Sequence, residues 1–231
     1  MNIMLTWARG HALLLLLSVG TVFNVFWLYR FRDKLALKLP VILLLSILHT
    51  AAGVLSVKIF ANIEGFGDPG AAGGMSLFGG IFFMPLFYAA VSRMIKRPAA
   101  DVFDYFTVCM VFTVMCARIN CIISGCCKGA HIVGTDGPRW PTRELEVLFY
   151  IILLYFLSNW ILKEKYKGKV YLIYVMAYGC FRFIEEFFRD SSWGLGVFHK
   201  AHIWALIAFG LAGSIYAELL KQQSKRSKRR N

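Results

Sequence analysis

Long apolar runs dominate the sequence and constrain its fold more than any other feature. Hydrophobic residues make up 58% of the 231 positions and charged residues 17%, against roughly 45–50% and about 25% in soluble domains. A membrane-spanning helix needs about 20 predominantly apolar residues. The runs and the polar breaks between them predict about seven spans: 11–29, 39–60, 75–95, 104–124, 144–162, 170–188 and 202–220. We therefore expect an all-α polytopic membrane protein in which residues 1–220 form a single transmembrane domain.

The basic residues indicate how these spans are oriented. The chain carries 26 lysines and arginines and a formal net charge of +13. Most of them lie in four segments that come at every second loop, within residues 30–38, 93–97, 163–169 and 221–231. By the positive-inside rule these segments face the cytoplasm, which predicts an N-terminus outside and a cytoplasmic C-terminus. We expect the basic tail, residues 221–231, to contact anionic lipid headgroups, so the charge does not call for a nucleic-acid partner.

Neither the cysteines nor the N-terminus indicates a secreted protein. Most of the six cysteines lie in apolar runs, unlike the disulfide framework of a small secreted domain. The N-terminal apolar run continues through residues 21–29 without a small-residue cleavage site. We therefore interpret it as a first span and not as a removable signal.

Two segments break the pattern of helices. The glycine-rich segment near residues 64–80 indicates a loop or re-entrant backbone, which persists at membrane depth only inside protein or beside a wet cavity. The alternative is a flexible external loop followed by a close helix contact through small residues. The turn-rich segment 125–143 is predicted to lie outside and to cap the outer end of the bundle.

Ionisable residues inside the predicted spans mark the candidate site. Placing one there costs at least about 2.5–3.5 kcal/mol, so it must face protein or water and is a functional candidate. Arg118 is the first of them. A second group shares one helical face of the segment 171–190 by its spacing: Tyr174, Tyr178, Arg182, Glu186 and Arg189. Arg182 is spaced to pair with Glu186, and Glu185 is spaced to pair with Arg189.

Two interpretations of these charges stay open. One is a structural ion-pair network that ties the helix to its neighbours. The other is phosphate binding, because a guanidinium presents a planar, bidentate fork to phosphate oxygens. The topology places Arg118 and Arg182 near the outer leaflet, where two guanidiniums facing one cavity would bind a phospholipid headgroup. Glu186 would then orient Arg182 or act as a base.

Four sequence blocks carry a resemblance to a known family. In chain order they are GGMSLFGG (73–80), ARINCIISGCCKG (117–129), WPTRELE (140–146) and YGCFRFIEEFFRD (178–190). They resemble, in the same order, blocks of the prolipoprotein diacylglyceryl transferase family of bacterial membrane enzymes, in its cysteine-containing branch. The last block is specific and the second fairly so. Residues 73–190, a little over half of the chain, contain all four.

The resemblance implies seven spans with the N-terminus outside, in a bacterial inner membrane, with the active site facing the outer leaflet. It implies transfer of the diacylglyceryl group of phosphatidylglycerol to a prolipoprotein lipobox cysteine or another thiol, without a metal or soluble cofactor. Glycerol phosphate is released. By the same resemblance the catalytic residues are Arg118 and Arg182, which hold the phosphate, and Glu186, which positions Arg182. The implied substrate-binding residues are Ser76, Gly79, Gly80, Cys121, Gly129, Tyr178 and Arg189.

The chain departs from the family at four positions. Phe78 stands where characterised members usually carry a histidine, proposed to help activate the thiol. Cys121 stands where they carry an asparagine, and Trp140 and Leu145 replace a histidine and a tyrosine. Thiol transfer therefore lacks its usual base candidate.

Two histidines on the predicted outer side are the candidates to replace that base. They are His131 and His202. The alternative for each is a solvated histidine in a loop or at a helix end.

Cys121, Cys126 and Cys127 allow three interpretations. The resemblance makes the vicinal pair a structural turn at the end of a span. A thiol–disulfide exchanger would also use vicinal thiols, but the usual C-x-x-C spacing is absent. A zinc site would recruit His131, yet a second ligand pair is missing from the sequence pattern.

Three classes of function follow. The first is a phospholipid-dependent transferase that acts on a prolipoprotein cysteine or on another acceptor. The second is a non-catalytic phospholipid-binding membrane protein that kept the arginines without the base. The third is a membrane thiol oxidoreductase. The family resemblance favours the first.

Overall fold

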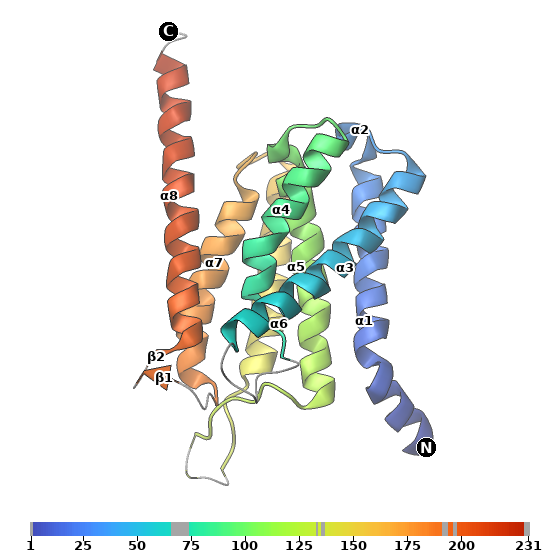
Figure 1. Ribbon diagram of the computed structural model, residues 1–231, viewed down its shortest axis with the longest axis vertical. Coiled ribbons are helices and arrows are strands. Elements are labelled where there is room, and N and C mark those ends of the chain that lie inside the picture. Colours follow the sequence, from blue (N-terminus) through green and yellow to red (C-terminus); the bar gives the residue numbers. More distant parts are fainter. Residues whose placement is uncertain are drawn as a thin grey trace.

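The computed structural model describes residues 2–65, 74–132, 134, 137–190, 194–195 and 198–228, which are mostly helical (Figure 1). The elements are α1 (Asn2–Arg30), α2 (Arg32–Leu35), α3 (Leu39–Glu64), α4 (Phe78–Met94), α5 (Ala99–Ser124), α6 (Thr142–Leu162), α7 (Val170–Glu185), the 3-10 helix η2 (Glu186–Phe188), β1 (Gly194–Leu195), β2 (Phe198–His199) and α8 (Lys200–Lys228). The two short strands pair antiparallel. Each of the seven predicted spans coincides with one helix.

Five helices in the described part of the chain are long and apolar enough to cross a membrane: α1, α3, α5, α6 and α8. The other two predicted spans coincide with α4, of 17 residues, and α7, of 16 residues. This confirms the all-α polytopic membrane fold. The number of helices that cross the bilayer, and their orientation, stay predictions.

The basic segments gather at one end of the bundle, the end where the C-terminus lies (Figure 1). Lys34 of α2 pairs with Glu164, between α6 and α7. Lys167 Nζ lies 3.4 Å from Asp101 Oδ1, in the first turn of α5. The loop 125–141, the β1–β2 hairpin and the N-terminus lie at the other end (Figure 1). This separation of charge is the one that the positive-inside rule associates with membrane proteins.

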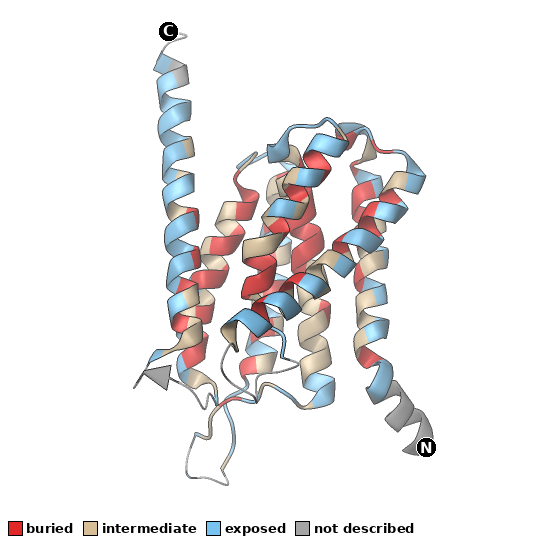
Figure 2. Ribbon diagram, in the orientation of Figure 1, coloured by how far each residue is buried: buried red, intermediate tan, exposed pale blue. Residues whose placement is uncertain are grey.

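The bundle exposes many large apolar side chains and buries several polar ones, and Figure 2 shows how exposed and buried residues are distributed over the helices. Large apolar side chains that are more than half exposed include Leu14, Phe26, Leu86, Tyr155 and Leu206. Buried polar residues include Asn24, His49, Glu146, Arg182 and Glu185. A soluble protein rarely exposes so much contiguous apolar surface. In a bilayer the outer surface meets acyl chains, and polar groups must find partners inside the protein.

The described part of the glycine-rich segment folds back along α3. The Ser76 amide donates to the Val57 carbonyl (3.1 Å). Val57 lies seven residues before the end of α3 at Glu64, or about 10 Å along a helix axis at 1.5 Å per residue. Residues 74–77 are not helical. This agrees with the predicted loop or re-entrant backbone for residues 74–77, whereas residues 78–80 belong to α4 and residues 66–73 lie outside the described part of the chain.

A close contact between α3 and α4 depends on one glycine. A Cβ on Gly79 would overlap the Ser56 carbonyl oxygen and lie 2.8 Å from Phe60 Cβ. A Cβ on the adjacent Gly80 would meet Met110 Sδ at 3.8 Å, an ordinary van der Waals distance. The small-residue helix contact, which was the alternative interpretation of this segment, therefore exists together with the fold-back.

We expect Gly79→Ala to lower the free energy of unfolding by about 1–3 kcal/mol, the usual cost of overpacking a tight contact. Gly80→Ala should change it by less than about 1 kcal/mol, because alanine fits there and favours the helix. Unfolding by SDS of the protein in detergent micelles, followed by tryptophan fluorescence, measures both. Equal losses in the two variants would contradict the tight contact at Gly79.

Candidate active site

The polar stripe of α7 faces the interior of the bundle, as its spacing predicted. Tyr178 and Arg182 are more than nine-tenths buried. Arg182 Nη1 lies 2.5 Å from Glu185 Oε2, and Arg182 Nη2 lies 2.6 Å from Glu186 Oε2. Arg189 Nη1 lies 3.4 Å from Glu185 Oε1. Both ion pairs predicted from the sequence, Arg182–Glu186 and Glu185–Arg189, are confirmed.

Glu146 of α6 joins this group to Arg118 of α5. The Glu146 side chain is fully buried, with Oε1 at 3.0 Å from Arg118 Nη2 and Oε2 at 3.8 Å from Arg189 Nη1. The resulting ion-pair network consists of Arg118, Arg182, Arg189, Glu146, Glu185 and Glu186. Its formal charges cancel, which matters because removal of one partner leaves a buried charge uncompensated. The network ties α5, α6 and α7 together, as the structural interpretation predicted.

Arg118 keeps hydrogen-bonding capacity that the network does not use. Its guanidinium has five N–H donors, and its Nε has no hydrogen-bond partner among the described residues. The Arg118–Glu146 contact is close but poorly aligned, since neither Glu146 oxygen accepts a hydrogen bond within the described part of the chain. Arg182, by contrast, donates a hydrogen bond to Glu185 and forms a second ion pair with Glu186. Arg118 is therefore the arginine better able to bind an anion.

A cavity of about 410 Å³ lies beside Arg118. Most of its lining is apolar and comes from α1, α3, α4 and α5. The polar and thiol residues that line it are His49, Thr50, Thr113, Arg118, Asn120, Cys121, Cys126, Cys127 and Tyr174. A largely apolar cavity of this size with a few convergent polar groups suits an amphiphilic ligand. Of the two arginines predicted to face one cavity, Arg118 lines this one, and Arg182 is not among its described lining residues.

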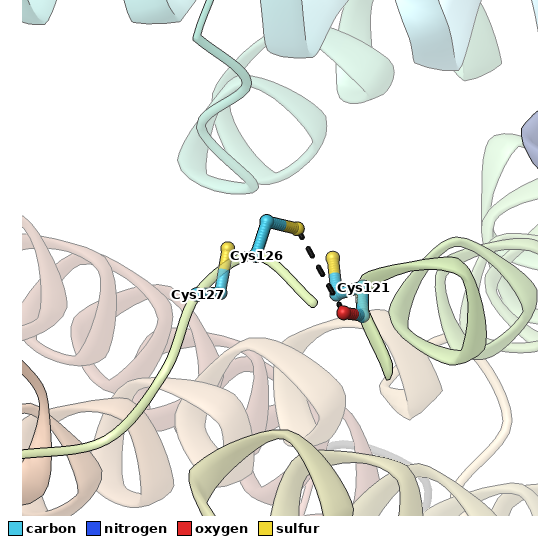
Figure 3. Close-up of side chains that lie close together, drawn as sticks. All are labelled: Cys121, Cys126 and Cys127. Atoms are coloured by element: carbon cyan, nitrogen blue, oxygen red, sulfur yellow. Dashed lines mark hydrogen bonds between the residues drawn. The ribbon is translucent and has the colours of Figure 1, made fainter. Parts of the chain in front are cut away.

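Three thiols meet at the wall of this cavity (Figure 3). The Sγ atoms of Cys121, Cys126 and Cys127 all lie within 4.8 Å of one another. The Cys126 thiol donates to the Cys121 carbonyl oxygen at 3.9 Å. The pKa of the Cys127 thiol is lowered by its interaction with the Cys121 thiol and by the nearby positive charges of Arg189 and Arg118, against the opposing effect of burial.

The glycine-rich segment contributes to the cavity wall and to the packing behind it. Gly80 lines the cavity, whereas Ser76 and Gly79 pack against α3. Phe78, at the position of the expected histidine, is buried and packs edge-on against Tyr178 with ring centroids 5.7 Å apart. This position therefore offers an aromatic contact and no base.

The described part of the loop 125–141 contacts the chain just after η2. Gly129 forms an antiparallel bridge with Arg189, and Arg139 Nη1 donates to the Gly129 carbonyl oxygen (3.0 Å). A Cβ on Gly129 would overlap the Trp140 carbonyl oxygen. The absence of a side chain at Gly129 therefore allows the backbone at Trp140 to approach this closely.

The two candidate bases are not among the described residues that line the cavity. His131 Nδ1 lies 2.8 Å from the Gly137 carbonyl oxygen within the loop 125–141. His202 is buried in α8, where its Nδ1 accepts a hydrogen bond from the His199 amide (3.0 Å). His199 Nδ1 lies 3.6 Å from Glu186 Oε1. His202 is thus held beside the Glu186 end of the network and not beside the thiols.

Sequence reasoning missed three residues of this region. Glu146 is the third residue of the predicted span 144–162, and His49 lies within the span 39–60, with Nε2 at 3.2 Å from Tyr88 Oη. Both carried a signal, because an ionisable side chain inside a span is a functional candidate whatever its type. His199 carried none, since it lies between spans.

Comparison with known proteins gives a family match and several relatives. A family model described as prolipoprotein diacylglyceryl transferase matches residues 15–217, a range that contains all four sequence blocks. The chain is 30% identical over 141 residues to the phosphatidylglycerol–prolipoprotein diacylglyceryl transferase of Pasteurella multocida, covering 57% of this chain and 52% of the relative. It is 29% identical over 139 residues to that of Paracidovorax citrulli, covering 54% and 51%. With the protein of that name from Dehalococcoides mccartyi, identity is 22% over 237 residues, covering 93% and 91%. The chain thus spans about half the length of the first two relatives.

We expect Glu146→Ala to destabilise the protein by about 3–5 kcal/mol, because it leaves the Arg118 charge buried without its partner. The double variant Arg118→Ala/Glu146→Ala should lose less than the sum of the single losses, by a coupling of about 0.5–3 kcal/mol. Unfolding by SDS of the wild type, Arg118→Ala, Glu146→Ala and the double variant measures this coupling.

Glu144→Ala is the matched control on the same helix. Its more exposed pair with Arg143 (3.6 Å) should contribute less than about 1 kcal/mol. If the double variant loses as much stability as Arg118→Ala and Glu146→Ala lose together, Arg118 and Glu146 do not act as a pair.

Proposed function

Since the chain belongs to the prolipoprotein diacylglyceryl transferase family, we propose that it is an enzyme that transfers the diacylglyceryl group of phosphatidylglycerol to a thiol and releases glycerol phosphate. The acceptor that we propose is the lipobox cysteine of a prolipoprotein. The names of the relatives support both substrates. Because the first two relatives align over only about half their length, the substrates need a direct test on this chain.

The observation that carries the proposal is Arg118, with an unused donor, at the wall of a largely apolar cavity. A phosphatidylglycerol molecule needs a cation for its phosphate and apolar surroundings for its diacylglyceryl group. Arg118 supports the first requirement through its guanidinium fork, and the lining from α1, α3 and α4 supports the second. A cavity of this size would hold the headgroup and glycerol backbone, with the acyl chains extending into the bilayer.

The proposed reaction is a displacement at a glycerol carbon. The acceptor sulfur forms a C–S bond as the C–O bond to the phosphate breaks, and glycerol phosphate leaves with the electron pair. Guanidiniums held in place beforehand stabilise the charge that develops on the leaving phosphate. In our proposal Arg118 binds the phosphate, Arg182 stabilises the departing glycerol phosphate, and Glu186, 2.6 Å from Arg182, positions that guanidinium.

The other predicted substrate-binding residues take different roles in this proposal. Gly80 and Cys121 line the cavity and would contact the lipid directly. The remaining residues would shape its walls or hold the network, and they are Ser76, Gly79, Gly129, Tyr178 and Arg189. Their burial and backbone contacts support positioning rather than chemistry.

We place the protein in the cytoplasmic (inner) membrane of a bacterium, with the thiol end of the cavity toward the outer leaflet. The gathering of basic segments at the opposite end supports this orientation. The basic tail, residues 221–231, would then meet anionic headgroups on the cytoplasmic side.

Turnover is tested with purified protein in liposomes that contain phosphatidylglycerol labelled in its terminal glycerol, together with a fluorescent lipobox peptide. We expect a diacylglyceryl mass shift on the peptide with stoichiometric glycerol phosphate. Arg118→Gln and Arg182→Gln should each reduce turnover about 100-fold or more, the usual cost of losing a group that stabilises developing charge.

Arg143→Gln, outside the network at the start of α6, is the control and should keep its activity. Near wild-type turnover in both network variants would overturn the site. Glycerol phosphate without modified peptide would mean a different acceptor. Lipid binding without either product would support the non-catalytic interpretation.

Orientation is tested with one introduced cysteine at a time, in a chain from which the exposed Cys126 and Cys180 and the half-buried Cys121 and Cys127 have been removed. Ile132→Cys, in the outer loop, should react with a membrane-impermeant maleimide in intact spheroplasts. Lys165→Cys, between α6 and α7, should react only after permeabilisation. The reverse pattern would place the cavity at the cytoplasmic side.

A further inference from the structure

The three thiols of Cys121, Cys126 and Cys127 line the cavity of the proposed reaction, yet none of them has a chemical role in the transfer proposed above. They lie within 4.8 Å of one another and line the same cavity as Arg118. Among the described residues, no histidine, carboxylate or further cysteine belongs to this group. His131, which the zinc interpretation recruited from the sequence, is therefore not a ligand in this arrangement.

The backbone that brings the thiols together is unusual. Gly125 ends α5 in the left-handed conformation (φ 72°), and Cys127 adopts it as well (φ 54°). A residue with a side chain pays about 1–2 kcal/mol for this conformation, and such residues concentrate at functional sites. The two turns reverse the chain, so that Cys126 and Cys127 lie beside Cys121 in the last turn of α5 (Figure 3).

The spacing of the sulfur atoms is close to that of a metal site. With Zn–S bonds near 2.3 Å, a tetrahedral ion holds its sulfur ligands about 3.8 Å apart. The thiols would need to close by about 1 Å at most, which side-chain rotation at the exposed Cys126 and half-buried Cys127 can provide. Arg189 and Arg118, both electrostatically coupled to Cys127, would offset the negative charge of three thiolates.

We propose that Cys121, Cys126 and Cys127 bind a zinc ion whose fourth coordination position faces the cavity and takes the acceptor thiol. Three protein ligands with one open position distinguish a catalytic zinc site from a closed structural one. The identity of the fourth ligand rests on the proposed function, whereas the three protein ligands rest on the geometry alone.

The zinc ion would promote deprotonation of the acceptor thiol, the step for which this chain lacks the usual histidine. A free thiol with a pKa of about 8.5 is mostly protonated at neutral pH, and the thiolate is the nucleophile. A thiol that coordinates zinc loses its proton, here to water in the cavity. The sulfur then forms its bond to the glycerol carbon, the C–O bond breaks, and glycerol phosphate takes the electron pair. Zinc keeps its oxidation state throughout. Phe78, buried against Tyr178, is consistent with a site that needs no base there.

The first test measures metal binding and not turnover. Full-length protein, purified in detergent under reducing conditions without chelator, should contain equimolar zinc. Replacement by Co²⁺ should produce a sulfur-to-cobalt charge-transfer absorption. Cys121→Ser and Cys127→Ser should lose the metal, whereas Cys180→Ser, an exposed cysteine on α7 outside the cluster, should keep it. A lipobox peptide should alter the cobalt spectrum, and the same peptide with serine in place of cysteine should not.

The second test links the metal to the reaction. Removal of zinc by a chelator should abolish peptide modification, and added zinc should restore it. Metal binding that survives in Cys121→Ser and Cys127→Ser, or a disulfide among the three cysteines in protein alkylated at lysis, would overturn the inference.

The outcomes separate this inference from the proposed function. Peptide modification that persists without zinc and in both cysteine variants would remove the zinc inference and leave the transferase in place. A cobalt spectrum that responds to the peptide thiol, without any diacylglyceryl product, would leave the zinc site in place and remove the transferase.

Discussion

Charge compensation inside an apolar bundle is the constraint on which the rest of this structure depends. Arg118, Glu146 and Arg182 lie on three different helices and are almost completely buried, in a protein whose outer surface is apolar. A charge in such surroundings must be paired inside the protein. The network therefore fixes how α5, α6 and α7 sit against one another. Its incomplete use of Arg118 leaves a guanidinium donor beside the cavity.

The same constraint explains how a cavity can exist beside non-helical backbone. Residues 74–77, just before α4, are not helical, and a lipid-facing segment could not leave its backbone groups unpaired. They line the cavity or pack against α3, where Val57 accepts a hydrogen bond from Ser76. The close approach at Gly79 holds α4 against α3 behind them. In our proposal the lipid phosphate and the acceptor thiol would thus bind in the same cavity that the three cysteines line.

Much of this arrangement was predictable because it depends on local spacing. Apolar runs of about 20 residues predicted every long helix, and the i, i+4 spacing on α7 predicted two ion pairs that the structure confirms. Arg118 was conspicuous as a charge within an apolar run. Glu146 and His49 were equally detectable in principle, because each is an ionisable residue within a predicted span. The roles of all these residues in lipid binding remain predictions.

The sequence by itself determined the long apolar helices, the inward face of α7 and the family to which the chain belongs, because each depends on residue order and periodicity. Only the tertiary structure decided which arginine faces the cavity, that Glu146 joins Arg118 to Arg189, and that three thiols converge. These relations join side chains from different helices or across a chain reversal. Their distances depend on helix packing and on the left-handed turns at Gly125 and Cys127, which sequence spacing does not specify.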